Sequence, residues 1–200
     1  MFDPAAAPER RAELFRAAAA LPLGAEGLMA KPISNLGWSS PRSADDAFVG
    51  RTDQHSAAHL VRAAIEGGAL AVAHLLAPAI EAGLQISEMR LSGPATGAAP
   101  GPLSGGEPVP APLIQLRADF FSVPVVIGQN PEASAAGAAA LAGVAAGSFA
   151  NLREASQVVA APAQRVEPDQ RAHDRARELL QNYGALSSAT GESGAGRRED

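Results

Sequence analysis

Apolar residues recur at three- and four-residue steps in several stretches of the chain, which is the spacing of one buried helix face. In the clearest case, Leu113, Leu116 and Phe120 follow one another at such steps. Glycine or proline lies at the ends of most of these stretches. The pattern predicts helices over residues 8–20, 55–83, 111–121, 133–147, 151–159 and 167–183.

The second of these helices is the longest, and its sequence gives signals for both of its ends. Thr52 or Asp53 can cap its start, and Gly83 ends it. Pro78 lies near its end and removes one internal hydrogen bond, so we expect a bend there. His55 and His59 stand four residues apart, which is metal-ligand spacing on a helix. No third ligand is placed to join them, so capping and surface roles are the preferred interpretation.

Short runs with strand character alternate with the predicted helices. They cover residues 27–33, 87–92 and 123–127, the last of which is rich in β-branched residues. The alternation predicts an α/β fold, in which helices cover a small sheet. The polar residues 34–50 and the proline- and glycine-rich residues 93–112 are expected to form loops. Gly184 is the expected end of the last helix, so the folded domain covers residues 1–186 and residues 187–200 form a disordered tail.

The segment from Ala111 to Gly147 carries the most information. An amphipathic helix leads into a core strand, and Asn130 with Pro131 then suits the start of a second helix. That second helix contains almost nothing larger than alanine, apart from Leu141 and Val144. Such a helix fills little volume, so it lets another backbone or a flat ligand approach closely. The sequence alone leaves both interpretations open, tight helix packing and a ligand wall.

Composition restricts the class of protein. The chain has 200 residues, no cysteine and a formal net charge of -5. The absence of cysteine excludes a disulfide framework or a thiolate site, and the default location is the cytoplasm. The acidic balance and the lack of a dense basic cluster argue against nucleic acid as a partner. No uninterrupted run of about 18 apolar residues predicts a membrane span. Neither a paired-carboxylate site nor a nucleophile elbow is visible.

Five segments, taken in order, resemble the C-terminal domain of the FGGY family of carbohydrate kinases. Each motif alone is weakly specific, but their common order and spacing make the resemblance strong. The matching segments are GAEGLMAKPI (24–33), AFVGRTDQHSAAHLVRAAIEGGAL (47–70), QLRADFFSVPVV (115–126), EASAAGAAALAGVAAG (132–147) and VEPDQRAHD (166–174).

The resemblance implies a ribonuclease-H-like domain of the actin-like ATPase superfamily. It also implies ATP and Mg²⁺ as cofactors and a sugar or polyol as phosphoryl acceptor, with a xylulose-type enzyme favoured. In that family the catalytic carboxylate and most of the sugar site lie in a first domain, which has no counterpart in this chain. A separate first kinase domain or a homo-oligomer is therefore an expected partner, and this half alone is expected to be inactive.

In the family, a glycine turn between strand and helix contacts the nucleotide through bare backbone N–H groups. This chain holds two partial copies of that motif. Gly93 follows the strand, but Pro94 then removes a donor, whereas Gly105 and Gly106 keep the family register relative to the next helix. The helix-anchored pair is the preferred candidate, with Gly137 of the small-residue helix as the opposite wall. No catalytic residue and no metal ligand are assigned.

Two hypotheses about function follow. The first is the nucleotide-binding half of an ATP-dependent carbohydrate kinase. The second is a non-catalytic remnant or interaction module that keeps the kinase fold, because the insertion between the two partial glycine motifs interrupts the nucleotide turn.

Overall fold

The computed structural model describes residues 7–31, 47–92, 110–128, 132–159 and 162–195. The element order is α1 (Ala7–Ala19), η1 (Ala25–Gly27), β1 (Met29–Ala30), β2 (Phe48–Val49), α2 (Ala57–Glu81), β3 (Met89–Leu91), α3 (Ala111–Phe121), β4 (Val125–Gly128), α4 (Ala133–Ala145), α5 (Leu152–Val159), β5 (Pro162–Val166) and α6 (His173–Ala195). The predicted α/β class is confirmed.

The main sheet has three strands in the order β3-β4-β5. β3 and β4 are parallel, with Met89 opposite Val125, and β5 is antiparallel to β4, with Val166 opposite Val125. β4 is the buried centre of the sheet because its residues Val125 to Ile127 are all buried. β1 and β2 form a separate antiparallel pair beside the start of α2.

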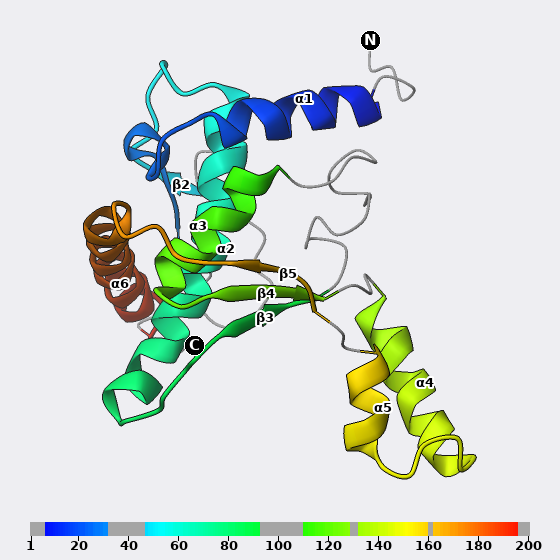
Figure 1. The fold of residues 1–200 in the computed structure, drawn as a ribbon. Coiled ribbons are helices and arrows are strands. Elements are labelled where there is room, and N and C mark those ends of the chain that lie inside the picture. Colours follow the sequence, from blue (N-terminus) through cyan, green and yellow to red (C-terminus); the bar gives the residue numbers. More distant parts are fainter. Residues whose placement is uncertain (1–6, 32–46, 93–109, 129–131, 160–161, 196–200) are drawn as a thin grey trace, which may run out of the picture.

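Helix α3 is apolar on two faces, which places it between the sheet and two other helices (Figure 1). Ile114 and Ala118 pack on the sheet with Val125 and Ile127 of β4. The other face joins the main core, where it meets α2 and α6. That core contains Ala69, Leu70, Leu113, Leu116, Phe120, Ala176, Leu179 and Tyr183.

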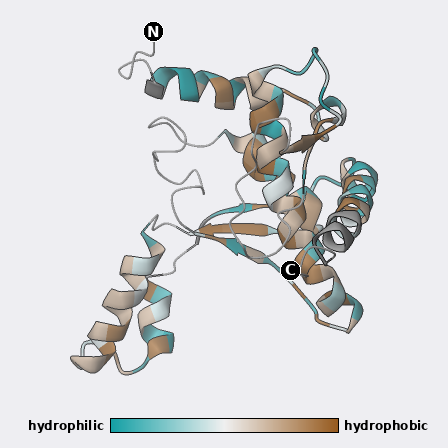
Figure 2. Ribbon diagram, turned by 180° about the vertical axis from the view of Figure 1, so that it is seen from behind, coloured by the Kyte–Doolittle hydropathy of each residue, from teal (hydrophilic) through white to brown (hydrophobic). Residues whose placement is uncertain are grey.

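Helices α4 and α5 pack against each other as a hairpin that stands away from the three-helix core (Figure 1). The hairpin is mostly hydrophobic in composition, as Figure 2 shows, yet its buried residues are the three alanines Ala136, Ala140 and Ala155. Because alanine buries little area, the hairpin has a thin core compared with the rest of the domain.

Among the described helices, α2 is long and apolar enough to cross a membrane by length and composition. A helix through the middle of a domain has the same character, and α2 contributes Ala69 and Leu70 to the main core. It also buries Arg62 and Glu66, which are 4% and 3% exposed. We therefore interpret α2 as a core helix.

Several predicted boundaries are wrong. The N-cap of α2 is Ser56, not Thr52 or Asp53, because the Ser56 N–H and the His59 ring form a local hydrogen bond of 3.1 Å. The expected loop 34–50 contains β2 at its end, and the strand β5 was not predicted. The cap expected at Asn130 lies outside the described residues, and Glu132 occupies the N-cap of α4.

The last helix also differs from the prediction. It begins at His173 rather than beside Pro168, and it continues through Gly184 to Ala195, where the sequence suggested a disordered tail from residue 187. Gly184 lies within this helix and faces His74, whose ring atoms would lie 3.5 Å from an added Cβ. The Ser188 hydroxyl donates to the Gly184 carbonyl over 3.1 Å, which supports the helix past the glycine. The domain limit at residue 186 stays a prediction.

Candidate functional site

The parallel strands β3 and β4 end at the same edge of the main sheet. β3 ends at Leu91 and β4 ends at Gly128, and the two strands run in the same direction. The carboxyl ends of parallel strands are where open α/β sheets bind ligands. The chain that carries the candidate glycines leaves β3 at this edge, and the chain that leads to α4 leaves β4 there.

The predicted contacts Gly93, Gly105 and Gly106 lie outside the described residues, so their role stays a prediction. Gly137 lies in the second turn of α4. A Cβ added at Gly137 would meet no atom within 4 Å, so the glycine faces open space. One turn further along, Leu141 is 60% exposed. The face of α4 that carries Gly137 is therefore open to an approaching ligand, while Ala136 and Ala140 are buried.

Two polar residues of the QLRAD segment attach the end of β5 to α3. The buried Asp119 carboxylate accepts the N–H of Asp169 over 2.8 Å and the side-chain amide of Gln115 over 2.9 Å. The same Gln115 amide donates to the carbonyl of Glu167 over 2.7 Å. The Asp119 carboxylate therefore has a hydrogen-bond donor in the VEPD segment (166–169), 50 residues away in sequence. Its role is structural.

A polar hollow of about 690 Å³ lies at the start of α2, and it was not predicted from the sequence. It is lined by Phe48, Gly50, Arg51, Thr52, Asp53 and His55. Its shape depends on Gly50, which has a φ of +78° and leaves no room for a Cβ beside the Gly27 carbonyl. Two features of the sequence could have indicated this hollow. They are Gly50, which follows β2, and the polar residues 51–53 after it.

The histidines beside this hollow act as hydrogen-bond acceptors for the backbone. His55 Nδ1 accepts the N–H of Thr52 over 2.9 Å, and His59 Nδ1 accepts the N–H of Ser56 over 3.1 Å. The second ring nitrogen of His59 lies 3.2 Å from a Glu26 carboxylate oxygen. Within the described residues no group of three or more His, Asp or Glu side chains could hold a metal ion. The capping interpretation is confirmed for His59, which completes the capping box of α2 with Ser56. His55 accepts its hydrogen bond from the turn before the helix.

A buried ion pair of α2 contacts the segment before β1. Glu66 pairs with Arg62 one turn earlier in α2, and both Glu66 oxygens lie 3.1 Å from the backbone N–H of Gly24. Burial raises the pKa of the Glu66 carboxyl above its ordinary value, while Arg62 and the Gly24 N–H oppose the rise. The pair therefore ties the segment before β1 to the middle of α2.

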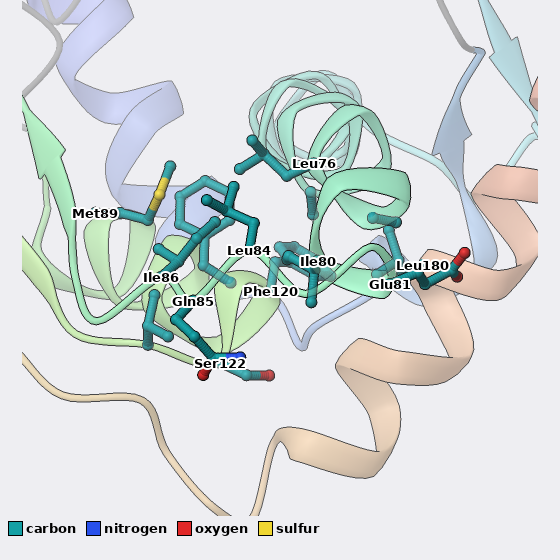
Figure 3. Close-up of a pocket in the computed structure, with 14 residues that line it drawn as sticks. Leu76, Ile80, Glu81, Leu84, Gln85, Ile86, Met89, Phe120, Ser122 and Leu180 are labelled. Carbon is teal, nitrogen blue, oxygen red and sulfur yellow. The ribbon is translucent and has the colours of Figure 1, made fainter.

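A second cavity, of about 440 Å³, lies at the opposite end of α2 (Figure 3). Apolar side chains such as Leu76, Ile80 and Phe120 line most of it, and Glu81 is the charged residue in its wall. The cavity adjoins Met89 and Val123, which lie at the amino ends of β3 and β4. Its apolar lining and its position make it unsuitable for a nucleotide phosphate.

Comparison with known proteins gives the same family by sequence and by fold. The model of the FGGY family of carbohydrate kinases, C-terminal domain, matches residues 5–146. A glycerol kinase of Bordetella parapertussis is 40% identical over 108 residues, which are 54% of this chain and 19% of the relative. A glycerol kinase of Aromatoleum aromaticum is 35% identical over 150 residues, or 72% of this chain and 27% of the relative.

Solved structures extend the likeness over almost the whole chain. The xylulose kinase from Rhodospirillum rubrum has a TM-score of 0.62 and 26% identity, with 89% of this chain and 33% of that chain covered. The ligand-bound xylulose kinase from Lactobacillus acidophilus has a TM-score of 0.66 at 21% identity, with 88% and 34% covered, and supports the fold alone.

The chain spans about a fifth to a quarter of the length of the curated relatives it matches. The family match covers α1 to α4, including the sheet edge, α4 and the hollow at the start of α2. The chain therefore belongs to the FGGY family of carbohydrate kinases, within which it corresponds to the C-terminal domain.

Proposed function

We propose that this domain is the nucleotide-binding half of an ATP-dependent kinase that phosphorylates a hydroxyl group of a small sugar or polyol. The observation that carries the proposal is the open glycine face of α4, the helix that follows β4 after the carboxyl edge of the parallel strands β3 and β4. The family match supplies the class of enzyme. The cytoplasmic location stays a prediction.

The domain would contribute by positioning the nucleotide, because phosphoryl transfer depends mainly on positioning and electrostatic stabilisation. Backbone N–H groups near Gly105 and Gly106 would hold the nucleotide on one side, and the Gly137 face of α4 would form the other wall. The carboxylate that accepts the proton from the sugar would come from a first kinase domain, which the longer relatives have room to contain.

Mg²⁺ would arrive with the nucleotide, since it is usually held by phosphates and one or two carboxylates rather than by an all-protein cage. When bound, Mg²⁺ supplies charge neutralisation at the phosphates. The residues assigned here act on the nucleotide and require no direct metal ligand from the described part of the chain.

The acceptor is proposed only as a class. The sequence segments favour a xylulose-type enzyme, and the relatives at 35–40% identity are glycerol kinases. Both acceptors are small polyhydroxylated molecules, so the proposal covers a sugar or polyol hydroxyl. The assay that distinguishes them needs the complete two-domain enzyme, with glycerol and xylulose offered side by side.

The second candidate is a non-catalytic module that keeps the kinase fold. It is favoured by Pro94, which replaces a backbone donor where the nucleotide turn needs one, and by the insertion that separates Gly93 from Gly105. The two candidates differ in nucleotide binding. The kinase-half proposal requires saturable binding of MgATP, and the module requires none.

Calorimetric titration of MgATP into the purified chain tests the proposal, with two matched variants. Gly137 and Gly68 are both helical glycines with no atom within 4 Å of an added Cβ. We expect Gly137→Leu to weaken MgATP binding at least tenfold, because the new side chain would fill the nucleotide side of α4. Gly68→Leu on α2 should leave the affinity unchanged. Equal affinities of the two variants would contradict the assignment of α4 as the nucleotide wall.

A further inference from the structure

The segment before β1 contains an unusual backbone turn. Four consecutive residues have positive φ angles: Gly24 (94°), Ala25 (44°), Glu26 (55°) and Gly27 (97°). Glycine adopts this conformation freely, but the same conformation is strained for a residue with a side chain. Such a turn persists only where surrounding contacts determine it more strongly than its own preference.

Packing and a buried hydrogen bond hold the turn, and the Arg175 side chain lies against Gly24. Ala25 is fully buried and packs with Leu28 and Ala63 in a small cluster beneath the start of α2. The Gly24 N–H points at the buried Glu66 carboxylate, 3.1 Å from each oxygen, and Glu66 is paired with Arg62. A charged, buried acceptor makes a stronger hydrogen bond to a backbone N–H than a neutral one does.

The turn in its left-handed form places two groups against the start of α2. Glu26 extends its carboxylate to within 3.2 Å of His59 Nε2. Because His59 Nδ1 accepts the Ser56 N–H that begins α2, Nε2 carries the proton and donates to Glu26. The carbonyl of Gly27 lies directly beside Gly50, at a distance that only glycine allows, and Gly50 opens the run that lines the polar hollow.

From these contacts we infer that Glu66 is a positioning residue: through the Gly24 N–H it fixes the left-handed turn, and the turn fixes the ring of His59 and the polar hollow at the start of α2. Glu66 and His59 both belong to α2, and each of them contacts the turn, Glu66 through Gly24 and His59 through Glu26. The inference concerns the fold of this chain and stands independently of nucleotide binding.

Amide hydrogen exchange and imidazole ¹⁵N spectra of the intact chain test this inference. In the wild-type chain we expect the Gly24 amide to exchange as slowly as the amides of Ala69 and Leu70 in the middle of α2. Exchange of Gly24 at the rate of an open loop would overturn the inference at once, before any variant is made.

Three variants then separate the steps. Glu66→Ala should speed exchange at Gly24 at least tenfold and shift the His59 ring resonances, whereas Glu66→Gln keeps an oxygen acceptor and should restore most of the protection. Glu26→Ala should shift the His59 ring but leave Gly24 protected. Glu88→Gln, which removes the exposed ion pairs with Arg90 and Arg165 at the main sheet, is the control and should change neither.

A His59 ring that is unchanged by Glu66→Ala would show that packing alone holds the turn, and would contradict the inference. If Glu66→Ala does not fold, the wild-type exchange rate of Gly24 and the Glu26→Ala result still decide it. A Gly24 amide that loses protection in Glu26→Ala would also contradict it, because the order of the contacts would then be reversed.

Discussion

The three-helix core and the α4–α5 hairpin achieve stability in different ways. In the core, large side chains such as Leu70 and Leu116 are 1% exposed, and the buried pair Arg62 and Glu66 is satisfied by internal hydrogen bonds. In the hairpin, the buried side chains are alanines, and Leu141 and Leu152 are 60% and 52% exposed. The core is therefore specified by volume and buried polar contacts, and the hairpin mainly by helix propensity and the close approach of two backbones.

This difference suggests how the domain separates stability from binding. A helix that contributes little to the core can present glycine and alanine on an open face without loss of the fold. The face of α4 that carries Gly137 is such a surface. Changes in the core should consequently cost stability, and changes on α4 should mainly affect what the domain binds.

The largest expected effect is at the buried ion pair. Glu66→Ala leaves the Arg62 guanidinium buried without its partner, and loss of one member of a buried pair costs about 3–5 kcal/mol. Urea denaturation of the wild type and the variant measures the difference in the free energy of unfolding. Glu178→Gln is the exposed control and should cost less than about 1 kcal/mol. If both variants lowered the free energy of unfolding equally, the buried pair would contribute no more to stability than an exposed one.

The next effect compares two leucines of the same helix. Leu70 is 1% exposed in the main core, and Leu75 is 77% exposed. Leu70→Ala should lower the free energy of unfolding by about 2–5 kcal/mol, because it leaves a cavity. Leu75→Ala should stay within about 0.5 kcal/mol of the wild type. Denaturation curves decide the point, and a similar cost for both would mean that the exposed face of α2 is covered in solution.

A smaller effect, of opposite sign, is expected in the hairpin. Gly137→Ala should stabilise α4 by about 0.5–1 kcal/mol, since it adds helix propensity in open space. At Gly143 a new Cβ would lie 2.7 Å from the Phe149 ring, so Gly143→Ala should gain less or destabilise. Hydrogen exchange of the α4 amides measures both. Faster exchange in Gly137→Ala would show that its surroundings are occupied.

The smallest effect is electrostatic and lies at the sheet. Glu88 pairs with Arg90 of β3 at 2.9 Å and with Arg165 of β5 at 3.0 Å, and the hydrogen bond from Arg90 is the main cause that lowers the pKa of Glu88. A lowered carboxyl pKa contributes stability above the ordinary value of 4.5, which is lost as the pH falls through the folded-state value.

Glu88→Gln should therefore lower the urea midpoint slightly at pH 7, and the difference from the wild type should shrink as the pH falls below 4.5 and the wild-type carboxyl becomes protonated. High salt should reduce the difference at pH 7. A difference that does not shrink as the pH falls would assign the effect of Glu88 to packing.

The sequence predicted the elements that depend on local pattern. The amphipathic spacing of Leu113, Leu116 and Phe120 and the β-branched run of β4 identified α3 and the central strand. β5 was missed because Gln164 and Arg165 lack strand character, and the strand forms by pairing with β4. The cap at Ser56 was missed because His59, which completes it, is an uncommon residue for that role.

The candidate site was predictable only through the family resemblance. The small residues of α4 indicated close approach but not what approaches, and Gly93, Gly105 and Gly106 lie outside the described residues. The left-handed turn at Ala25 and Glu26 could not be predicted from local sequence, because its cost is offset by Glu66, about 40 residues away. The fold thus follows from periodicity, whereas the site depends on contacts between distant segments.

The central claim, that this domain binds the nucleotide of a carbohydrate kinase, is tested most directly by calorimetric titration of MgATP into the wild-type chain. The account predicts saturable binding that is retained in Gly68→Leu and at least tenfold weaker in Gly137→Leu. No saturable binding to the wild-type chain at millimolar MgATP would contradict the claim and leave the non-catalytic module as the function of this fold.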